Sequence, residues 1–410
     1  MDHCAQPGLL PIEEAITRIF NSLNPIQEIE TVSLPAALDR VLAADINAPI
    51  NVPGADNSAM DGYALRAQDC AGELKIIGQS LAGHPFTDAI AAGQALRIMT
   101  GALIPPGADA VVMQENTLRN NELLTITQAI SAGENIRYAG EDIALNSQVF
   151  SAGCRITALD IGLLASLGIA QVNVLRKLRV AILTTGDELL ISGAAPAAGK
   201  IYDSNRPLLT ALLTRLSVEL LDLGVVPDQP AALRDAFNQA MQWADVVIST
   251  GGVSVGDADY TKEILAELGE INLWKIAMKP GKPFAFGKLG SGYFFGLPGN
   301  PVSTAVTYHQ LVVPGLRHLA GETFFVSDTQ QCLSAIASHT IKKQPGRTDF
   351  QRGIFANENG INRVASAGLQ SSGVLSAMAK ANCYIRLEAE RGTVAEGEAV
   401  TVIPFDRFIR

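Results

Sequence analysis

The residues most able to do chemistry lie in a glycine-rich loop, Ser249–Tyr260, that joins an apolar run to an amphipathic segment. Glycines in such a loop let backbone N–H groups approach an anion, and the start of the following helix adds a favourable dipole. The loop matches neither the Gly-x-Gly-x-x-Gly nor the Walker pattern, which disfavours a nicotinamide or P-loop ligand. A tight connection in which Asp257 or Asp259 only caps the helix explains the same residues.

Acidic residues follow two strands of the same predicted sheet. Asp187 and Glu188 come directly after the apolar run Arg179–Thr185, and Asp257 and Asp259 belong to the glycine loop. Because parallel strands end at one edge, these carboxylates are expected on a single rim, where ligands of open α/β sheets bind. Carboxylates beside a phosphate loop suggest Mg²⁺, a hard cation that takes oxygen ligands. The alternative to a metal site is that these acidic residues are solvated side chains in turns. That alternative is more plausible for one of the four carboxylates than for all of them.

A locally basic segment stands out in a chain whose formal net charge is −10. Lys275, Lys279 and Lys282 are interrupted by Pro280 and Pro283, so they do not form one solvated helical face. We expect a rigid loop that holds an anion. The alternative is that these lysines are solvent-exposed and bind nothing.

Two further motifs have a structural explanation of their own. Asn300 suits a helix N-cap and Pro301 the first helical position, so the turn at Pro298 is a weak functional signal by itself. Its value is that it brings another helix start close to the anion site. Ser204 lies in the polar stretch Ile201–Asn205 just ahead of a helix, where capping is again expected.

Strands alternate with helices between about Lys177 and Ala320, which predicts right-handed crossovers and a parallel sheet. The predicted strands are Arg179–Thr185, Glu219–Gly224 and Asp245–Ser249, and the predicted helices are Pro207–Leu216, Ala231–Trp243, Asp259–Leu268 and Val302–Leu319. This block is predicted to be a three-layer α/β domain.

The remaining segments divide around that block. A stretch rich in Gly and Pro carries short β-like runs, in which Asp61 and Thr100, each next to a glycine, could be turn formers. Helical patterns flank this stretch, so we expect one domain split by an insertion. The expected domains are a split elongated linker domain (1–46 and 140–177), a β-rich insertion (47–139), the α/β domain (178–325) and a C-terminal β-barrel (326–410).

Composition narrows the class of protein. With 48% hydrophobic and 18% charged residues the chain is not disordered, and no apolar run has the length of a membrane span. The acidic balance argues against wholesale binding to nucleic acid. Five cysteines without a Cys-x-x-Cys pair, and no secretory signal, fit a reducing cytosol. We expect a cytoplasmic protein with neither membrane nor nucleic-acid partner.

Taken together, these motifs resemble the MoeA family and the related E domain of gephyrin. Matching stretches appear in the family's order across most of the chain: Asp56–Ala64, Arg97–Gly101, Gly140–Asp142, Thr185–Leu189, Tyr202–Asn205, Ser249–Gly256, Lys279–Pro283 and Leu297–Pro301. The resemblance implies an elongated four-domain subunit, a homodimer and an active cleft built from both subunits. It also implies the reaction: adenylylated molybdopterin and molybdate give molybdenum cofactor and AMP, with Mg²⁺ required.

The resemblance also implies residue roles. Glu188 and Asp259 match the acids that matter most, and would act in catalysis and hold the metal. The residues that would bind substrate are Asp61, Thr100, Asp142, Ser204, Gly251, Gly252, Ser254, Lys275, Lys279, Pro298 and Pro301. The sequence departs from the family pattern at Tyr138 and Ala139, where relatives often carry more arginine, and at Ser371, where glycine is usual.

Other interpretations stay open. A molybdopterin adenylyltransferase would use the same sheet, but the small enzymes of that kind lack the segment carrying Asp61 and Thr100. A gephyrin-like scaffold would anchor receptor tails, although the chain shows no fused partner domain or long linker. A nucleotide-binding hydrolase of the competence-protein type shares only the α/β domain. The protein partners to consider are the upstream adenylyltransferase and downstream molybdoenzyme maturation factors.

Overall fold

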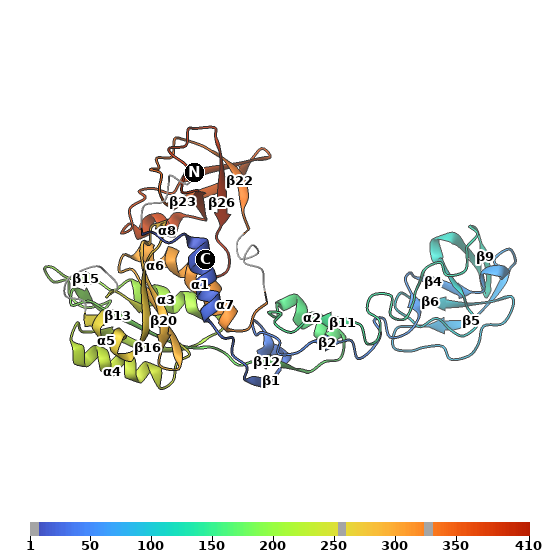
Figure 1. Cartoon of the computed structure of the whole chain (residues 1–410). Helices are drawn as coiled ribbons and strands as arrows, with labels where there is room; N and C mark the ends of the chain where they lie inside the picture. The colour runs from blue at the N-terminus through green and yellow to red at the C-terminus, as the bar shows by residue number, and fades with distance from the viewer. Residues whose placement is uncertain (1–7, 253–259, 324–330) are drawn as a thin grey trace. The chain divides into compact units, whose positions relative to one another are not determined.

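The computed structural model describes residues 8–252, 260–323 and 331–410 (Figure 1). The chain forms two units, each with its own sheets and cores. Unit 1 comprises Met1–Glu30, Asp39–Val41 and Val174–Arg410, and unit 2 comprises Thr31–Leu38 and Leu42–Asn173. The second unit is therefore inserted into the chain of the first.

A six-stranded sheet in the order β16-β13-β17-β21-β20-β18 forms the centre of unit 1. Its strands are β13 (Arg179–Thr185), β16 (Glu219–Val226), β17 (Val246–Thr250), β18 (Gly269–Lys275), β20 (Pro283–Leu289) and β21 (Gly292–Leu297). The strands β16, β13, β17 and β21 are parallel, whereas the β21–β20 and β20–β18 pairs are antiparallel. The parallel half therefore brings four carboxyl ends to one edge.

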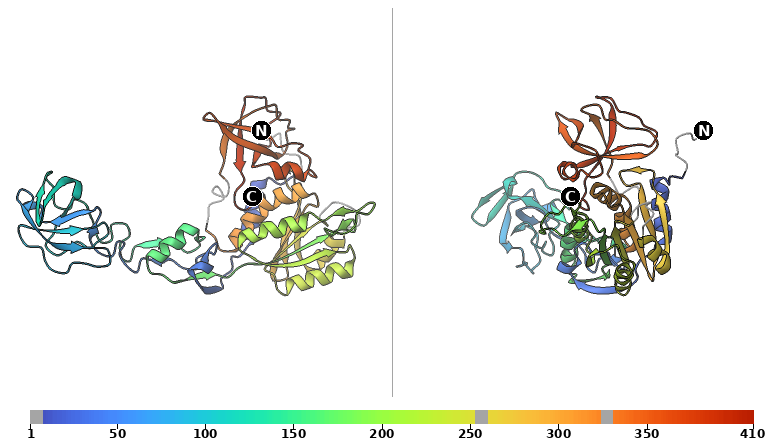
Figure 2. Two further views of the ribbon diagram at one scale, coloured as in Figure 1. Left: turned by 180° about the vertical axis from the view of Figure 1, so that it is seen from behind. Right: turned by 90° about the vertical axis from the view of Figure 1, so that its left-hand side faces the viewer.

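Side chains of the central strands alternate between two cores, one on each face of the sheet. Val180 and Ile182 of β13 belong to the first core, and Ala181 and Leu183 belong to the second. The helices of the first core are α1 (Ile12–Ser22), α3 (Asn205–Leu213), α6 (Pro301–Thr307) and α7 (Val313–Leu319), and those of the second are α4 (Pro230–Met241) and α5 (Tyr260–Leu268). The domain therefore has three layers, with helices on both sides of the sheet (Figure 2).

The C-terminal part of unit 1 is a closed barrel of five strands. These are β22 (Leu333–Ala337), β23 (Thr348–Glu358), β24 (Ile361–Ser366), β25 (Cys383–Leu387) and β26 (Ala399–Pro404), paired in the ring β23-β24-β22-β26-β25. The short strand β19 (Met278–Lys279) comes from the α/β domain and pairs in parallel with β23. Phe350 and Tyr384 of the barrel share a core with Tyr308 of the helical layer, so the two parts pack as one.

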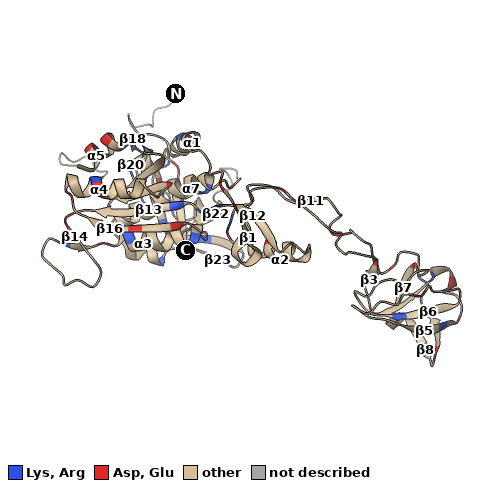
Figure 3. Ribbon diagram, turned by 90° about the horizontal axis from the view of Figure 1, so that it is seen from below, with Lys and Arg blue, Asp and Glu red and all other residues tan. Residues whose placement is uncertain are grey.

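Unit 2 is built around a six-stranded sheet in the order β7-β4-β6-β5-β9-β8. Its strands are β4 (Gly62–Leu65), β5 (Leu74–Ser80), β6 (Gln94–Ile98), β7 (Ala110–Met113), β8 (Thr117–Asn120) and β9 (Leu123–Ile126), and its helix is α2 (Ala158–Ser166). The remaining strands are β1 (Ile29–Ser33), β2 (Ile46–Asn47), β3 (Asn57–Ser58), β10 (Ile136–Arg137), β11 (Gln148–Phe150), β12 (Gln171–Leu175), β14 (Leu189–Leu190) and β15 (Ile201–Tyr202). Lys and Arg are scattered among Asp and Glu along the ribbons of both units (Figure 3).

The predicted fold class is confirmed: a three-layer α/β domain, a β-rich insertion and a C-terminal β-barrel. The predicted helix Val302–Leu319 is present but interrupted, because a π-helical turn at Tyr308–Val312 separates α6 from α7. Pro314 explains the interruption, since it has no N–H to donate to the carbonyl of Gln310 one turn earlier. None of the described helices is long and apolar enough to cross a membrane.

Two segments differ from the expectation. The basic segment around Lys279 is more than a loop, because β18 ends at Lys275, β19 pairs with the barrel and β20 begins at Pro283. The C-terminal segment, expected to be a β-barrel, also contains a helix, α8 (Leu375–Lys380). Six residues are too few to show an amphipathic period in a sequence.

Candidate active site

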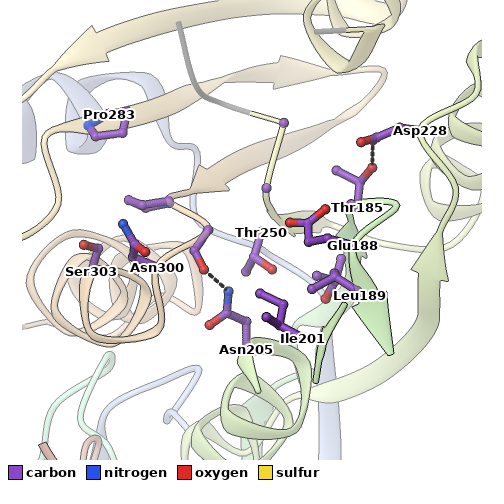
Figure 4. Close-up of a pocket in the computed structure, with 16 residues that line it drawn as sticks. Thr185, Glu188, Leu189, Ile201, Asn205, Asp228, Thr250, Pro283, Asn300 and Ser303 are labelled. Carbon is purple, nitrogen blue, oxygen red and sulfur yellow. Dashed lines mark hydrogen bonds between the residues drawn. The ribbon is translucent and has the colours of Figure 1, made fainter. Parts of the chain in front are cut away.

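A pocket of about 450 Å³ opens at the edge of the sheet where parallel strands end (Figure 4). Its lining residues are Thr184, Thr185, Gly186, Glu188, Leu189, Ile201, Asn205, Asp228, Thr250, Gly251, Gly252, Pro283, Pro298, Gly299, Asn300 and Ser303. Most of them lie at or just after the ends of β13, β16, β17 and β21 or at the starts of α3 and α6, whereas Leu189 and Ile201 belong to β14 and β15 and Pro283 begins β20. This is the carboxyl edge, where open α/β sheets bind their ligands.

Two buried threonines belong to the pocket wall. Thr184 of β13 and Thr250 of β17 are paired in register, and their exposed fractions are 2% and 0%. Neither hydroxyl has a hydrogen-bond partner among the described residues. A buried hydroxyl without a partner costs free energy, so the strand ends beneath the pocket are incompletely hydrogen-bonded within the part of the chain that the structure describes.

Glu188 follows β13 and lines the pocket, as the sequence predicted for a residue at the carboxyl edge. The turn favours glycine at Gly186, whose φ is +150°, and a Cβ there would also displace the Glu188 carboxylate, which lies 2.6 Å away. The Glu188 carbonyl accepts a hydrogen bond from the N–H of Ile201 at 2.9 Å. This bond ties the turn to the two-stranded sheet β14–β15, which we call the flap.

Asp228 is an acidic residue of the pocket that the sequence analysis missed. It follows β16 and accepts a hydrogen bond from the Thr185 hydroxyl, while its own N–H donates to Asp187 Oδ1 at 3.2 Å. The signal that could have found it is the one used for Glu188: a carboxylate just beyond the end of a parallel strand.

The acidic side chains of the pocket suit a hard cation. Glu188 and Asp228, with threonine hydroxyls nearby, offer the oxygen ligands that Mg²⁺ prefers, and such an ion is often held by one or two carboxylates plus phosphate oxygens. No cluster of three or more His, Cys, Asp or Glu side chains arranged for a metal occurs within residues 8–252, 260–323 and 331–410. Asp259, the other predicted metal ligand, lies outside the described residues.

The glycine loop begins in the pocket wall, with Gly251 and Gly252. Gly251 has a φ of +86°, and a Cβ there would lie 2.3 Å from the backbone oxygen of Thr185. Glycine is therefore required for the loop to approach β13, whether or not a ligand is bound. Ser254, predicted to bind substrate, lies outside the described residues.

At the start of α3, one side chain caps the helix and another lines the pocket. Asp203 is buried and accepts hydrogen bonds from the N–H groups of Asn205 and Arg206, both at 3.1 Å, so it caps the helix. Ser204, the predicted substrate-binding residue, makes no side-chain cap bond and does not line this pocket. Asn205 does line it, and its Nδ2 donates to the Gly299 carbonyl at 2.7 Å.

The turn before α6 agrees with the expected helix start at Pro301 but not with side-chain capping by Asn300. Pro301 occupies the first turn as expected, and Pro298 is buried with its carbonyl accepting from the Thr304 hydroxyl at 2.6 Å. Asn300 holds the N-cap position, yet its side chain makes no capping hydrogen bond and instead lines the pocket (Figure 4). The asparagine therefore has a side chain available to a ligand.

The two predicted lysines do not line this pocket. Lys275 is exposed at the end of β18. Lys279 points its ammonium at the buried carboxylate of Asp349 on barrel strand β23, with 3.4 Å between Nζ and Oδ2. The partner of Lys279 is thus seventy residues further along the chain, which no local motif could indicate.

The remaining predicted residues lie in unit 2. Asp61 Oδ1 accepts hydrogen bonds from both the N–H and the hydroxyl of Thr100, each at 2.7 Å. These bonds, the backbone one foremost, hold the pKa of Asp61 below its ordinary value. Asp142 is exposed, and its N–H donates to the Val52 carbonyl at 3.0 Å. The structure therefore joins Asp61 to Thr100 as a pair.

A pocket at the carboxyl ends of parallel strands, with helix starts and a glycine loop around it, defines a ligand-binding α/β domain. Three family models match the chain: the MoeA N-terminal region (domain I and II) over residues 10–168, a probable molybdopterin binding domain over 181–318, and the MoeA C-terminal region (domain IV) over 334–405. The chain belongs to the MoeA family.

Individual relatives agree along the whole chain. The molybdopterin molybdenumtransferase of Haemophilus influenzae is 46% identical over 405 residues, which cover 98% of this chain and 100% of that protein. The protein of the same name from a Nostoc species is 35% identical, covering 97% and 93%. The crystal structure of the molybdopterin biosynthesis MoeA protein from Pyrococcus horikoshii superposes with a TM-score of 0.83 at 30% identity, covering 97% and 100%.

Proposed function

We propose that the chain inserts molybdate into adenylylated molybdopterin, with Mg²⁺-dependent release of AMP. Membership of the MoeA family makes it a transferase of molybdenum-cofactor biosynthesis. The observation that carries the finer proposal is the pocket at the carboxyl edge, where Glu188 and Asp228 lie beside Thr184 and Thr250, whose hydroxyls have no partner among the described residues. Cleavage of a phosphoanhydride needs carboxylates that hold a cation and, beside them, hydrogen-bond donors that bind the phosphate anion.

Each group of the pocket has a distinct part in this proposal. Glu188 and Asp228 would hold Mg²⁺ together with Asp259. The bound ion would neutralise the negative charge that develops on the phosphate oxygens as the anhydride breaks. The threonine hydroxyls and the N–H groups of the glycine loop donate hydrogen bonds to phosphate oxygens and so fix the substrate. Lys279 and Lys275 would attract the two anions, molybdate and pyrophosphate, against the protein's net charge.

We also propose that the chain acts as a homodimer in the cytoplasm. This part of the proposal rests on what membership of the MoeA family implies. In the dimer, the Asp61–Thr100 pair of one subunit would contribute to the cleft of the other. The proposed protein partners are the upstream adenylyltransferase and downstream molybdoenzyme maturation factors. The proposal includes neither nucleic acid nor a membrane as a partner.

The test is incubation of the purified protein with adenylylated molybdopterin, molybdate and Mg²⁺. We expect AMP release that needs both molybdate and the metal, and a pterin product that carries molybdenum. A molybdopterin adenylyltransferase would instead consume ATP and free molybdopterin, and a scaffold would do neither. AMP release at the same rate without molybdate would exclude the proposed insertion.

A further inference from the structure

Asp349 is a carboxylate that the barrel buries beside the α/β domain. It lies on β23 opposite Lys279 of β19, and its side chain is 3% exposed. Side chains of paired residues stand on the same face of a sheet, so this register brings a carboxylate and an ammonium together. Lys279 Nζ lies 3.4 Å from Asp349 Oδ2. The strand pairing therefore places the two charges side by side.

A second barrel residue fixes the direction of this carboxylate. Gln351 Nε2 donates to Asp349 Oδ2 at 3.1 Å and to the Lys342 carbonyl at 2.9 Å. A backbone carbonyl can only accept, so the amide of Gln351 cannot be turned over without losing that bond. Asp349 is consequently held by the barrel, and Lys279 is the partner that comes from the α/β domain.

Two other cations face Asp349, and the barrel holds both through backbone carbonyls. Lys343, which is buried, donates to three of these at 2.8, 3.2 and 3.3 Å. Arg352, which is also buried, donates to two at 3.3 and 3.4 Å. Burial lowers the pKa of each cation, and the negative charge of Asp349 opposes that shift. Lys279 differs from both, because among the described residues its ammonium is bonded to Asp349 alone.

The ammonium of Lys279 can bind a ligand while Asp349 holds it. The Lys279 side chain is 47% exposed, and an ammonium has three N–H donors, so the contact with the carboxylate leaves others available. A lysine without a partner samples many rotamers, and ordering it when a ligand binds costs conformational entropy. The carboxylate restricts these rotamers in advance, which is preorganisation of a binding group.

We infer that Asp349 is a positioning residue, which holds the Lys279 ammonium in place for an oxyanion of the substrate. The inference rests on the proposed function, which assigns the anions to Lys279. Electrostatics alone predicts the opposite effect, because a negative charge behind the lysine weakens its attraction for an anion. Removing the charge of Asp349 therefore separates the two: positioning predicts weaker binding of the anion, and electrostatics alone predicts tighter binding.

Reductive methylation of the full chain tests the restraint without any substrate. In Asp349→Asn, Lys279 should be methylated about fivefold faster than in the wild type, the size of effect expected of a partly exposed ion pair. Lys288, an exposed lysine on β20, is the internal reference and should react at the wild-type rate unless the variant unfolds. Peptide mass spectrometry gives both rates. An unchanged ratio of the two rates would overturn the inference.

A double-mutant cycle tests whether the restraint matters to the reaction. Asp349→Asn should raise the KM for molybdate about tenfold and change kcat less than about twofold, because a binding group is mispositioned. In a Lys279→Met background the same change should alter KM by less than about twofold, since the group to be positioned is absent. Glu396→Gln, at an exposed acid of the barrel, is the matched control and should leave KM unchanged.

The outcomes that contradict a positioning role are specific. A merely structural carboxylate would change KM by the same factor in both backgrounds, and a dominant electrostatic effect would lower KM; either result overturns the inference. An unchanged KM in an active enzyme does so as well and leaves the insertion reaction standing. If the wild type releases no AMP with molybdate, the proposed function is wrong, and methylation alone decides whether Asp349 holds Lys279.

Discussion

The hydroxyl of Thr185 donates a hydrogen bond to the carboxylate of Asp228, so the ends of two neighbouring parallel strands are joined across the carboxyl edge of the sheet. The bond orients a carboxylate that would otherwise be a freely rotating side chain on the loop after β16. A carboxylate has several lone-pair directions, so the one used by Thr185 leaves others for a cation. Orientation by a neighbouring hydroxyl is typical of carboxylates that bind metals.

Asp228→Asn should reduce molybdate-dependent AMP release by about 100-fold, because the neutral amide no longer stabilises the cation. The loss should be smaller at high Mg²⁺ if Asp228 acts through the metal. The measurement is the rate of AMP release as a function of Mg²⁺ concentration. Asp235→Asn, the same change at an exposed position on α4, is the matched control and should leave the rate unchanged. Equal rates for both variants would remove Asp228 from the site.

Glu188→Gln and Asp259→Asn should each abolish molybdate-dependent AMP release while leaving the protein folded. Glu188 is exposed in the pocket wall, so the amide is not expected to disturb packing. Circular dichroism and thermal melting check the fold, and a single-turnover assay checks the chemistry. Near-normal turnover in either variant would show that its proposed role is wrong.

Gly251→Ala should destabilise the protein by about 1–3 kcal/mol, since the new Cβ meets a backbone oxygen at a positive φ. Gly299→Ala is the matched control in the same pocket, because a Cβ there meets nothing within 4 Å and the φ is not positive. Denaturant unfolding followed by fluorescence gives both free energies. Equal stability of the two variants would contradict the close approach of the loop to Thr185.

Thr100→Val should raise the pKa of Asp61 while leaving it below the ordinary value, because the hydroxyl donor is lost and the backbone N–H donor remains. A depressed carboxyl pKa favours the folded state above the unfolded-state pKa, and that contribution disappears as pH falls through the folded-state pKa. Carbon-13 NMR titration of the Asp61 carboxyl measures the shift. Thr100→Ser keeps the hydroxyl and should titrate like the wild type, so a shift there as well would contradict the assignment.

Mixed dimers test whether the cleft is shared between subunits. A subunit carrying Glu188→Gln, combined with one carrying Asp61→Asn, places both lesions in one cleft and leaves the other intact, if the insertion of one subunit serves the α/β domain of its partner. Turnover should then recover to about half the wild-type rate, because one of two sites is restored. Heterodimers that are shown to form but remain inactive would exclude a shared cleft.

Local patterns predicted much of the fold. The apolar run Arg179–Thr185 is a strand with those bounds, because burial and β-propensity act on neighbouring residues. The second half of the main sheet was not predicted. Its strands β18 and β20 are joined through a segment whose lysines and prolines indicated a loop.

The candidate site was predictable where chain order determines position. Glu188 and Gly251 line the pocket because parallel strands must end at one edge. The direction of a side chain is not determined in this way: Asn300 holds the N-cap position and yet leaves its amide for the pocket. Contacts between distant segments, such as Asp61 with Thr100 or Lys279 with Asp349, follow only from the tertiary structure.

The pairing of β19 with β23 has a consequence for how the chain melts. A strand that belongs to the α/β domain by sequence is hydrogen-bonded into the barrel, and Phe350 and Tyr384 lie in the core beneath the helical layer. Removing the barrel would strip an edge strand of its partner and open the helical core to water. The two parts are therefore one cooperative unit. A barrel taken from a relative would fit only if its own strand could pair with Met278 and Lys279.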